Sequence, residues 1–111
     1  MGSVKRGDVV LVAIQGDYGK LRPAVIIQSD YFAEHSSVVI CPLTSHLTNC
    51  PLFRILVEPL PYTGLKTISQ VMVDKPQTIK RDKLKDVIGY LDDDTLVKVS
   101  RNLIAFLGLA G

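Results

Sequence analysis

Tryptophan is absent from this sequence of 111 residues, and cysteine and histidine occur only twice each. No CxxC, HExxH, GxxxxGK[ST] or GxGxxG pattern is present, so no structural zinc site, Walker-type phosphate loop or dinucleotide fold is predicted. His35 and His46 have no third metal ligand at a helical spacing, and neither metal-dependent hydrolysis nor a cofactor is expected. No hydrophobic run approaches the ~20 residues that a membrane span needs.

An excess of either charge is also missing, with 13 basic against 11 acidic residues and a net charge of +2. The net charge therefore gives no indication of nucleic-acid binding. The first six residues lack the apolar region of a signal peptide. Without a secretion signal, Cys41 and Cys50 are expected to be free thiols in a reducing compartment. We therefore expect a cytoplasmic protein with no membrane partner.

What the sequence does contain is typical of one globular domain spanning residues 1–111. Hydrophobic residues make up 47% and charged residues 22%, which is ordinary globular composition. A domain of this size buries a core with a thin margin, so a dimer interface would help to stabilise it.

Short apolar, β-branched runs separated by glycine and proline predict a small curved sheet or partly open barrel. Because proline donates no N–H, we place Pro23 at the entrance of one strand and Pro42 at the end of the next. One run alternates polar and apolar residues, which predicts a half-exposed strand. The predicted strands cover residues 8–14, 24–28, 38–41, 53–58 and 67–73, with shorter ones at 77–79 and 87–91.

The C-terminal segment is predicted to be an amphipathic helix. Asp92 is a suitable N-cap, and Leu91 and Leu96 are spaced for a hydrophobic staple. Gly108 is a plausible terminator. The fold class is therefore mainly β (α+β), with five to seven short strands and one C-terminal helix. The apolar face of the helix comprises Leu96, Val99, Leu103, Phe106 and Leu107.

The glycine-containing loop before Arg22 and Pro23 places a guanidinium at the rim of the predicted sheet. Arginine offers a planar fork of donors that suits a phosphate group. Alternatively, Arg22 is a surface residue paired with Asp17 or Asp8.

Two other groups of polar residues follow predicted strands. Thr44 and His46 would point to the same side if their segment stayed extended, so that a hydroxyl and an imidazole could act on one phosphate. Alternatively, they form a solvated loop tip. Gln70 and Asp74 form the other pair, and the alternative for them is an edge-strand polar face and a turn cap.

Eight basic residues come mostly from strand ends and loops. If several converge they form a modest anion-binding patch; otherwise they are a solvated surface. These residues are Lys5, Arg6, Lys20, Arg22, Arg54, Lys75, Lys80 and Arg81.

Three segments, 5–9, 19–27 and 70–79, together with the entry to the last helix at 91–93, resemble the MazF/PemK toxins of bacterial toxin–antitoxin systems. The resemblance holds in order and spacing over nearly the whole chain. It implies an SH3-like barrel, a homodimer and a metal-independent endoribonuclease that cuts single-stranded mRNA at specific sequences and arrests growth. The products would carry a 2′,3′-cyclic phosphate and a free 5′-hydroxyl.

The same resemblance assigns roles to particular residues. Arg22 is the catalytic arginine, Thr44 assists it at the scissile phosphate, and Asp74 is the acid of the Asp-x-Pro stretch. Some relatives have His or Glu in the loop before Arg-Pro, where this chain has Asp17 and Tyr18, and some have Arg where it has Met72. His46 is then a substitute for proton transfer. Expected RNA contacts are Tyr18, Lys20, Ser45, Gln70 and Lys75. The aromatic rings of Tyr18, Phe53 and Tyr62 are candidates for stacking on bases; alternatively, they belong to the core.

The family also implies a partner, a small antitoxin whose acidic, disordered tail folds onto the toxin and blocks its site. Two other functions stay open. The gyrase poison CcdB is similar in size and shares the fold, but depends on a tryptophan near its C-terminus, which this chain lacks. A plain SH3-like binding module for peptide or nucleic acid is the other alternative.

Overall fold

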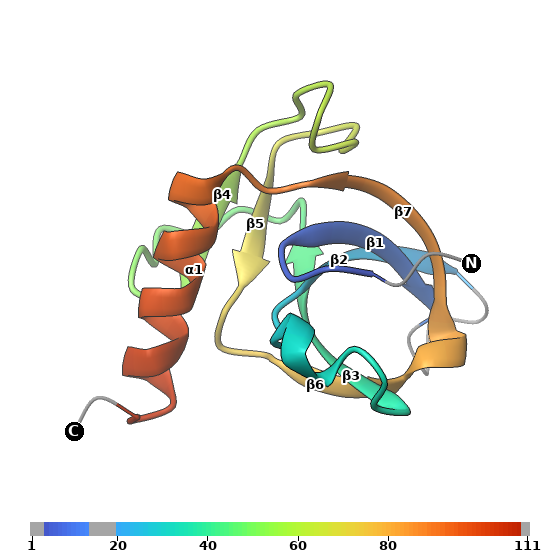
Figure 1. Cartoon of the computed structure of the whole chain (residues 1–111). Helices are drawn as coiled ribbons and strands as arrows, with labels where there is room; N and C mark the ends of the chain where they lie inside the picture. The colour runs from blue at the N-terminus through green and yellow to red at the C-terminus, as the bar shows by residue number, and fades with distance from the viewer. Residues whose placement is uncertain (1–3, 14–19, 110–111) are drawn as a thin grey trace.

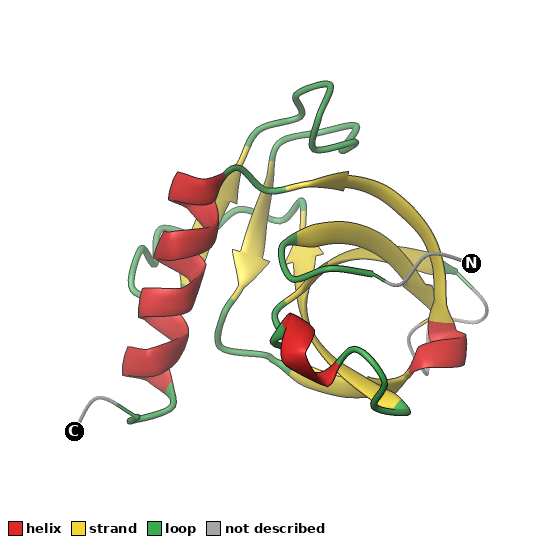
Figure 2. Cartoon of the chain, viewed as in Figure 1, coloured by secondary structure: helices red, strands yellow, loops and turns green. Residues whose placement is uncertain are grey.

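A computed structural model describes residues 4–13 and 20–109, which form one strongly curved sheet and a C-terminal helix (Figures 1 and 2). The seven strands lie in the order β4-β5-β3-β2-β1-β7, with β6 paired to β3. Their bounds are β1 Asp8–Ala13, β2 Leu21–Ile26, β3 Ser37–Thr44, β4 Arg54–Val57, β5 Ser69–Met72, β6 Gln77–Lys80 and β7 Leu84–Tyr90. Short 3-10 helices lie at Asp30–Phe32 and Arg81–Lys83, and the helix α1 is Asp93–Phe106.

The sheet bends into a ring that is nearly closed. Strands β6, β3, β2, β1 and β7 follow one another around the ring in Figure 1, while the described residues show no pairing between β6 and β7. Strands β4 and β5 extend from the far end of β3 and carry α1 on one side. The predicted mainly β fold with a partly open barrel and a C-terminal helix is confirmed.

Two apolar clusters cover the two faces of the sheet because side chains alternate along each strand. Val9 and Val25 face α1, whereas Val10 and Ala24 face the interior of the ring. Because side chains on both faces of β1 are buried, its sequence is a nearly continuous apolar run. Cys41 belongs to the cluster beneath α1, and burial, followed by the charge of Asp74, raises the pKa of its thiol to about 12.

The helix begins and ends as its sequence predicts. The Asp92 carboxylate accepts from the Thr95 N–H, and Gly108 adopts a φ of 72° just after the last turn. Val99 and Leu103 are buried against the sheet, whereas Phe106 and Leu107 remain half-exposed. The predicted apolar face is therefore covered over only part of its length. No helix in the described ranges is both long and apolar enough to cross a bilayer.

The prediction that Pro42 ends the third strand is wrong, because β3 continues to Thr44. Ile27 donates its N–H to the Val39 carbonyl at 3.1 Å, so the backbone groups of Val39 face β2. These groups alternate in direction along a strand, and Pro42 therefore faces the opposite edge. On that edge the partner changes from β6, paired up to Ile40, to β5, paired from Leu43. The missing N–H of Pro42 falls at this change of partner and leaves the pairing intact.

The second strand also differs from its prediction, since it starts at Leu21 rather than at residue 24. Leu21 and Pro23 pair with β1, but pairing with β3 begins only at Ala24. Both strands continue past this point without pairing to each other, β2 back to Leu21 and β3 on to Thr44. The fifth strand is a further correction, because Ser69, Gln70 and Val71 are all buried where a half-exposed strand was expected.

Candidate functional site

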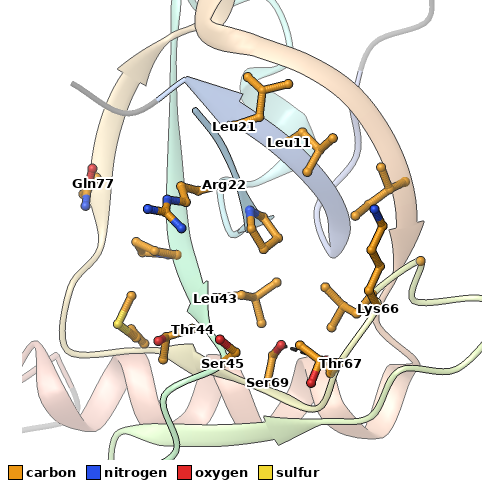
Figure 3. Close-up of a pocket in the computed structure, with 16 residues that line it drawn as sticks. Leu11, Leu21, Arg22, Leu43, Thr44, Ser45, Lys66, Thr67, Ser69 and Gln77 are labelled. Carbon is orange, nitrogen blue, oxygen red and sulfur yellow. Dashed lines mark hydrogen bonds between the residues drawn. The ribbon is translucent and has the colours of Figure 1, made fainter. Parts of the chain in front are cut away.

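A hollow of about 750 Å³ opens at the end of the ring, between the β1–β2 hairpin, the end of β3, the segment 64–69 and β7 (Figure 3). Its floor and walls are largely apolar, with Leu43 near the centre of the view. A concave apolar surface with a few convergent polar groups is typical of a ligand site. The apolar lining consists of Leu11, Leu21, Pro23, Pro42, Leu43, Gly64, Leu65, Met72 and Ile88.

The polar lining of this hollow is cationic. Three predicted site residues from two different strand ends line it together: Arg22, Thr44 and Ser45. Lys66, Thr67, Ser69 and Gln77 complete the polar lining, and no carboxylate occurs among the lining residues that the structure describes. Two cations with hydroxyl donors and no acid form an environment suited to a phosphate-bearing ligand.

Arg22 lies in the part of β2 that no longer pairs with β3. It pairs with Val12 in β1 and lies two residues before Ala24, the first residue of β2 to pair with β3. Its side chain is exposed, and Figure 3 shows the guanidinium inside the outline of the hollow. The guanidinium stays charged at any working pH, so this position carries a permanent positive charge.

Thr44 is the last residue of β3 and pairs with Gln70 in β5. Its Oγ1 accepts the backbone N–H of His46 at 3.1 Å. The bond fixes the oxygen and leaves the hydroxyl proton available for donation to a ligand. The chain bends at Ser45 and His46 instead of staying extended, so the basis for placing Thr44 and His46 on one side is wrong.

Gln70 lies beneath the loop that follows Thr44. Its Oε1 accepts the Thr48 N–H at 3.0 Å and its Nε2 donates to the Thr48 carbonyl at 2.8 Å. The side chain is only 8% exposed. Contact between Gln70 and RNA would require these bonds to break; as observed, its amide anchors the loop that carries Ser45 and His46.

Asp74 lies outside the lining of the hollow and is paired with Arg54. Arg54 Nε donates to Asp74 Oδ1 at 3.1 Å and Nη2 donates to Oδ2 at 3.3 Å. Arg54 Nη1 also donates to Thr48 Oγ1 at 3.2 Å, which ties the pair to the same loop. Desolvation acts to raise the pKa of Asp74, but the hydrogen bonds and charge of Arg54, with help from Lys75, outweigh it and lower that pKa overall.

This lowered pKa predicts how the stability contribution of Asp74 depends on pH. The folded protein binds the Asp74 proton more weakly than the unfolded chain, so the ion pair stabilises the fold above the ordinary pKa of 3.8. The contribution is lost as the pH falls through the folded-state pKa. We expect Asp74→Asn to lower the free energy of unfolding at pH 7, and the difference from wild type to shrink below pH 3.8.

Urea unfolding at pH 7, 5 and 3 measures this difference. The variant Arg54→Gln provides the control, because adding Asp74→Asn to it should produce little further pH dependence. A wild-type-to-Asn difference that stays constant over this range would contradict the prediction.

The remaining predicted site residues are dispersed. Lys20, His46 and Lys75 are exposed and do not line the hollow. Tyr18 lies outside the described residues. Arg22, Thr44 and Ser45 are thus the three predicted residues that the fold brings together, while the roles predicted for the others stay predictions.

Four polar residues of the hollow were not predicted from sequence: Lys66, Thr67, Ser69 and Gln77. Gly64, with a φ of 72°, is the one local signal of a specific turn before them. Nothing in their spacing indicates that they face Arg22, because only the ring brings β5, β6 and β2 to one opening. Among the described residues, no group of three or more His, Cys, Asp or Glu side chains is arranged to hold a metal ion.

Comparisons with known proteins place this geometry in context. Residues 5–107 match the family described as "PemK-like, MazF-like toxin of type II toxin-antitoxin system". The "Probable endoribonuclease MazF" of Mycolicibacterium smegmatis is 44% identical over 109 residues, covering 97% of this chain and 100% of the relative.

Solved structures share the fold. The Mycobacterium tuberculosis toxin MazF-mt6 superposes with a TM-score of 0.78 at 22% identity, over 91% of this chain and 96% of that one. An endoribonuclease in complex with its cognate antitoxin, from a mycobacterial species, has a TM-score of 0.78 at 25% identity, over 96% and 97%. A MazE–MazF complex from Deinococcus radiodurans has a TM-score of 0.77 at 20% identity, over 97% and 98%.

Proposed function

The chain belongs to the family of PemK-like, MazF-like toxins of type II toxin–antitoxin systems, and from this membership we propose that it is the toxin of such a pair and an endoribonuclease. The observation that carries the proposal is the convergence of Arg22, Thr44 and Ser45 on one hollow whose described lining contains no carboxylate. That environment favours a phosphodiester. The substrate is single-stranded mRNA in the cytoplasm, whose unpaired bases offer their edges for sequence-specific recognition.

RNA supplies its own nucleophile for this reaction. The 2′-hydroxyl loses its proton and its oxygen bonds to phosphorus, while the bond from phosphorus to the 5′-oxygen breaks and that oxygen takes up a proton. The products are a 2′,3′-cyclic phosphate and a 5′-hydroxyl. Arg22 and the Thr44 hydroxyl stabilise the negative charge that grows on the phosphoryl oxygens, and the reaction as proposed uses no metal or cofactor.

Proton transfer is assigned to His46. It lies two residues beyond Thr44, and its backbone N–H donates to the Thr44 hydroxyl oxygen. This bond fixes the backbone of His46 next to Thr44, while its exposed side chain lies outside the lining of the hollow. Asp74 accepts hydrogen bonds from Nε and Nη2 of Arg54, and we assign it the positioning of Arg54 and the Thr48 loop.

Replacing Thr44 by valine removes the donor and keeps the branched shape of the side chain. We expect kcat to fall by about 10²-fold, the usual cost of losing one donor to a developing oxyanion. Thr44→Ser keeps the hydroxyl and is expected to retain most of the activity. Cleavage rates of a fluorogenic oligoribonucleotide at saturating substrate measure both variants, and equal rates for valine and serine would contradict the assigned role.

The proposed inhibitory partner is an antitoxin with an acidic, disordered tail. Similar structures are solved with a cognate antitoxin bound and as a MazE–MazF complex, and the cations among the described lining residues are complementary to acidic side chains. The protein is also proposed to form homodimers, since Phe106 and Leu107 at the end of α1 are half-exposed. Light scattering of the purified protein tests the dimer.

The decisive experiment incubates the purified protein with a defined transcript in the presence of EDTA. We expect discrete cuts, fragment ends that map to one sequence motif, and 3′ ends that resist extension until the cyclic phosphate is removed. Intact RNA would favour the alternatives. Inhibition of gyrase would then indicate a CcdB-like poison, and RNA binding without cleavage would indicate a binding module.

A further inference from the structure

The hollow has a second cationic end that the proposed chemistry does not use. Figure 3 shows Lys66 on the opposite side of the hollow from Arg22, with Leu43 between them. The lysine comes from the connection between β4 and β5, far from Arg22 in sequence. In the described ranges no carboxylate pairs with its ammonium, which leaves this charge available for an anionic ligand.

The segment that carries Lys66 is anchored on both sides. Before it, the buried Thr63 donates its hydroxyl to the Glu58 and Leu60 carbonyls at 2.9 and 3.0 Å. After it, the Ser69 hydroxyl donates to the Thr67 carbonyl at 3.0 Å (Figure 3). Ser69 is 4% exposed and pairs with Val57 at the start of β5. Lys66 and Thr67 therefore stand between two fixed points at the wall of the hollow.

The space between the two cations suits a nucleotide. The volume of about 750 Å³ lies within the ~300–1,000 Å³ of ordinary small-molecule sites. Leu43 and Leu65 line it with apolar surface, against which a base or ribose can pack. A single RNA strand presents phosphates at regular intervals. If its scissile phosphate contacts Arg22, a neighbouring phosphate lies toward the Lys66 side of the hollow.

We propose that Lys66, with the Thr67 hydroxyl beside it, binds the RNA phosphate next to the scissile one, so that one nucleotide lies across the apolar floor between two held phosphates. This inference rests on the proposed function and extends it, because it makes Lys66 a positioning residue for the substrate. Charge-assisted contact to a phosphate fixes register on the strand and contributes no base specificity of its own.

The test uses Lys66→Gln with an oligonucleotide that contains one ribonucleotide at the mapped cut site. Three substrates are compared: the parent strand, and two strands in which the phosphate on either side of the scissile one is an uncharged methylphosphonate. We expect Lys66→Gln to lower kcat/KM about tenfold on the parent strand and to reduce the slope of log kcat/KM against log salt by about 1.

On one of the two methylphosphonate strands, wild type and Lys66→Gln should be equal, because the contact is already missing. That strand identifies the side on which the phosphate lies. Lys98→Gln, an exposed charge removal on α1, is the matched control and should behave as wild type on all three.

Two failures are distinguishable. If wild type cuts the parent strand but Lys66→Gln loses the same factor on all three substrates, or nothing on any, Lys66 does not bind this phosphate and the proposed function stands. If wild type cuts no RNA, both the proposed function and this inference are wrong.

Discussion

Arg22→Ala is expected to reduce RNA cleavage by about 10²–10³-fold while the protein stays folded. The substitution removes the permanent cation that faces the scissile phosphate, and one preorganised donor at a developing oxyanion is worth about that factor. The side chain is exposed near the end of a hairpin, so the core is untouched. Rates on an oligoribonucleotide, together with the thermal unfolding midpoint, measure the two expectations separately.

Two further variants make this result specific. Arg22→Lys keeps the charge but loses the planar fork, and we expect it to recover only part of the activity. Arg101→Ala removes an exposed guanidinium from α1 and should cleave at the wild-type rate. Full cleavage by Arg22→Ala would remove the proposed mechanism, because Arg22 is the cation to which the mechanism assigns stabilisation of the phosphoryl oxygens.

Gly64→Ala is expected to lower the free energy of unfolding by about 4 kcal/mol or more. Losses this large have only a few structural causes, and a steric clash in the folded backbone is one of them. An added Cβ would lie 2.0 Å from the Ile88 carbonyl oxygen and 2.6 Å from its carbon. Both are backbone atoms of β7, and Ile88 lies between Val87 and Gly89, which pair with β1 on either side of it. A domain of this size has a total stability of about 5–15 kcal/mol, so we expect a large loss of folded protein in urea titrations.

Gly108→Ala is the matched control for that prediction. Gly108 has the same φ of 72°, but nothing lies within 4 Å of its added Cβ. It therefore reports the cost of the left-handed backbone alone, about 1–2 kcal/mol. Equal losses in the two variants would contradict the close approach of Gly64 to β7.

Local sequence patterns predicted the fold where the cause is local. The cap at Asp92 and the apolar run of β1 depend on neighbouring residues, and both are confirmed. The continuation of β3 through Pro42 could not be predicted this way, because it depends on where two other strands start and stop. The burial of β5 likewise follows from its position between β4 and β3, and from the packing of Val71 in one cluster with Val99 and Leu103 of α1.

The residues of the candidate site show the same difference between what could and what could not be predicted from sequence. The family resemblance predicted site roles for Arg22, Thr44 and Ser45, and the fold brings these residues to one hollow. Gln70 and Asp74 are instead engaged by Thr48 and Arg54, partners about twenty positions away in the chain. Spacing along the sequence gives no warning of such partners, so polar residues that anchor a loop look the same as polar residues that bind a ligand.

The exchange of partners along β3 limits how any peptide can occupy the hollow. At a normal strand edge, an incoming chain gains affinity by extending the ladder of main-chain hydrogen bonds. Here the open position is Pro42, which lines the hollow and offers no N–H to a new strand. A polypeptide inhibitor seated at Pro42 gains no main-chain hydrogen bond from an N–H there, so its side chains contribute more of the binding. The positive charges of Arg22 and Lys66 favour acidic side chains.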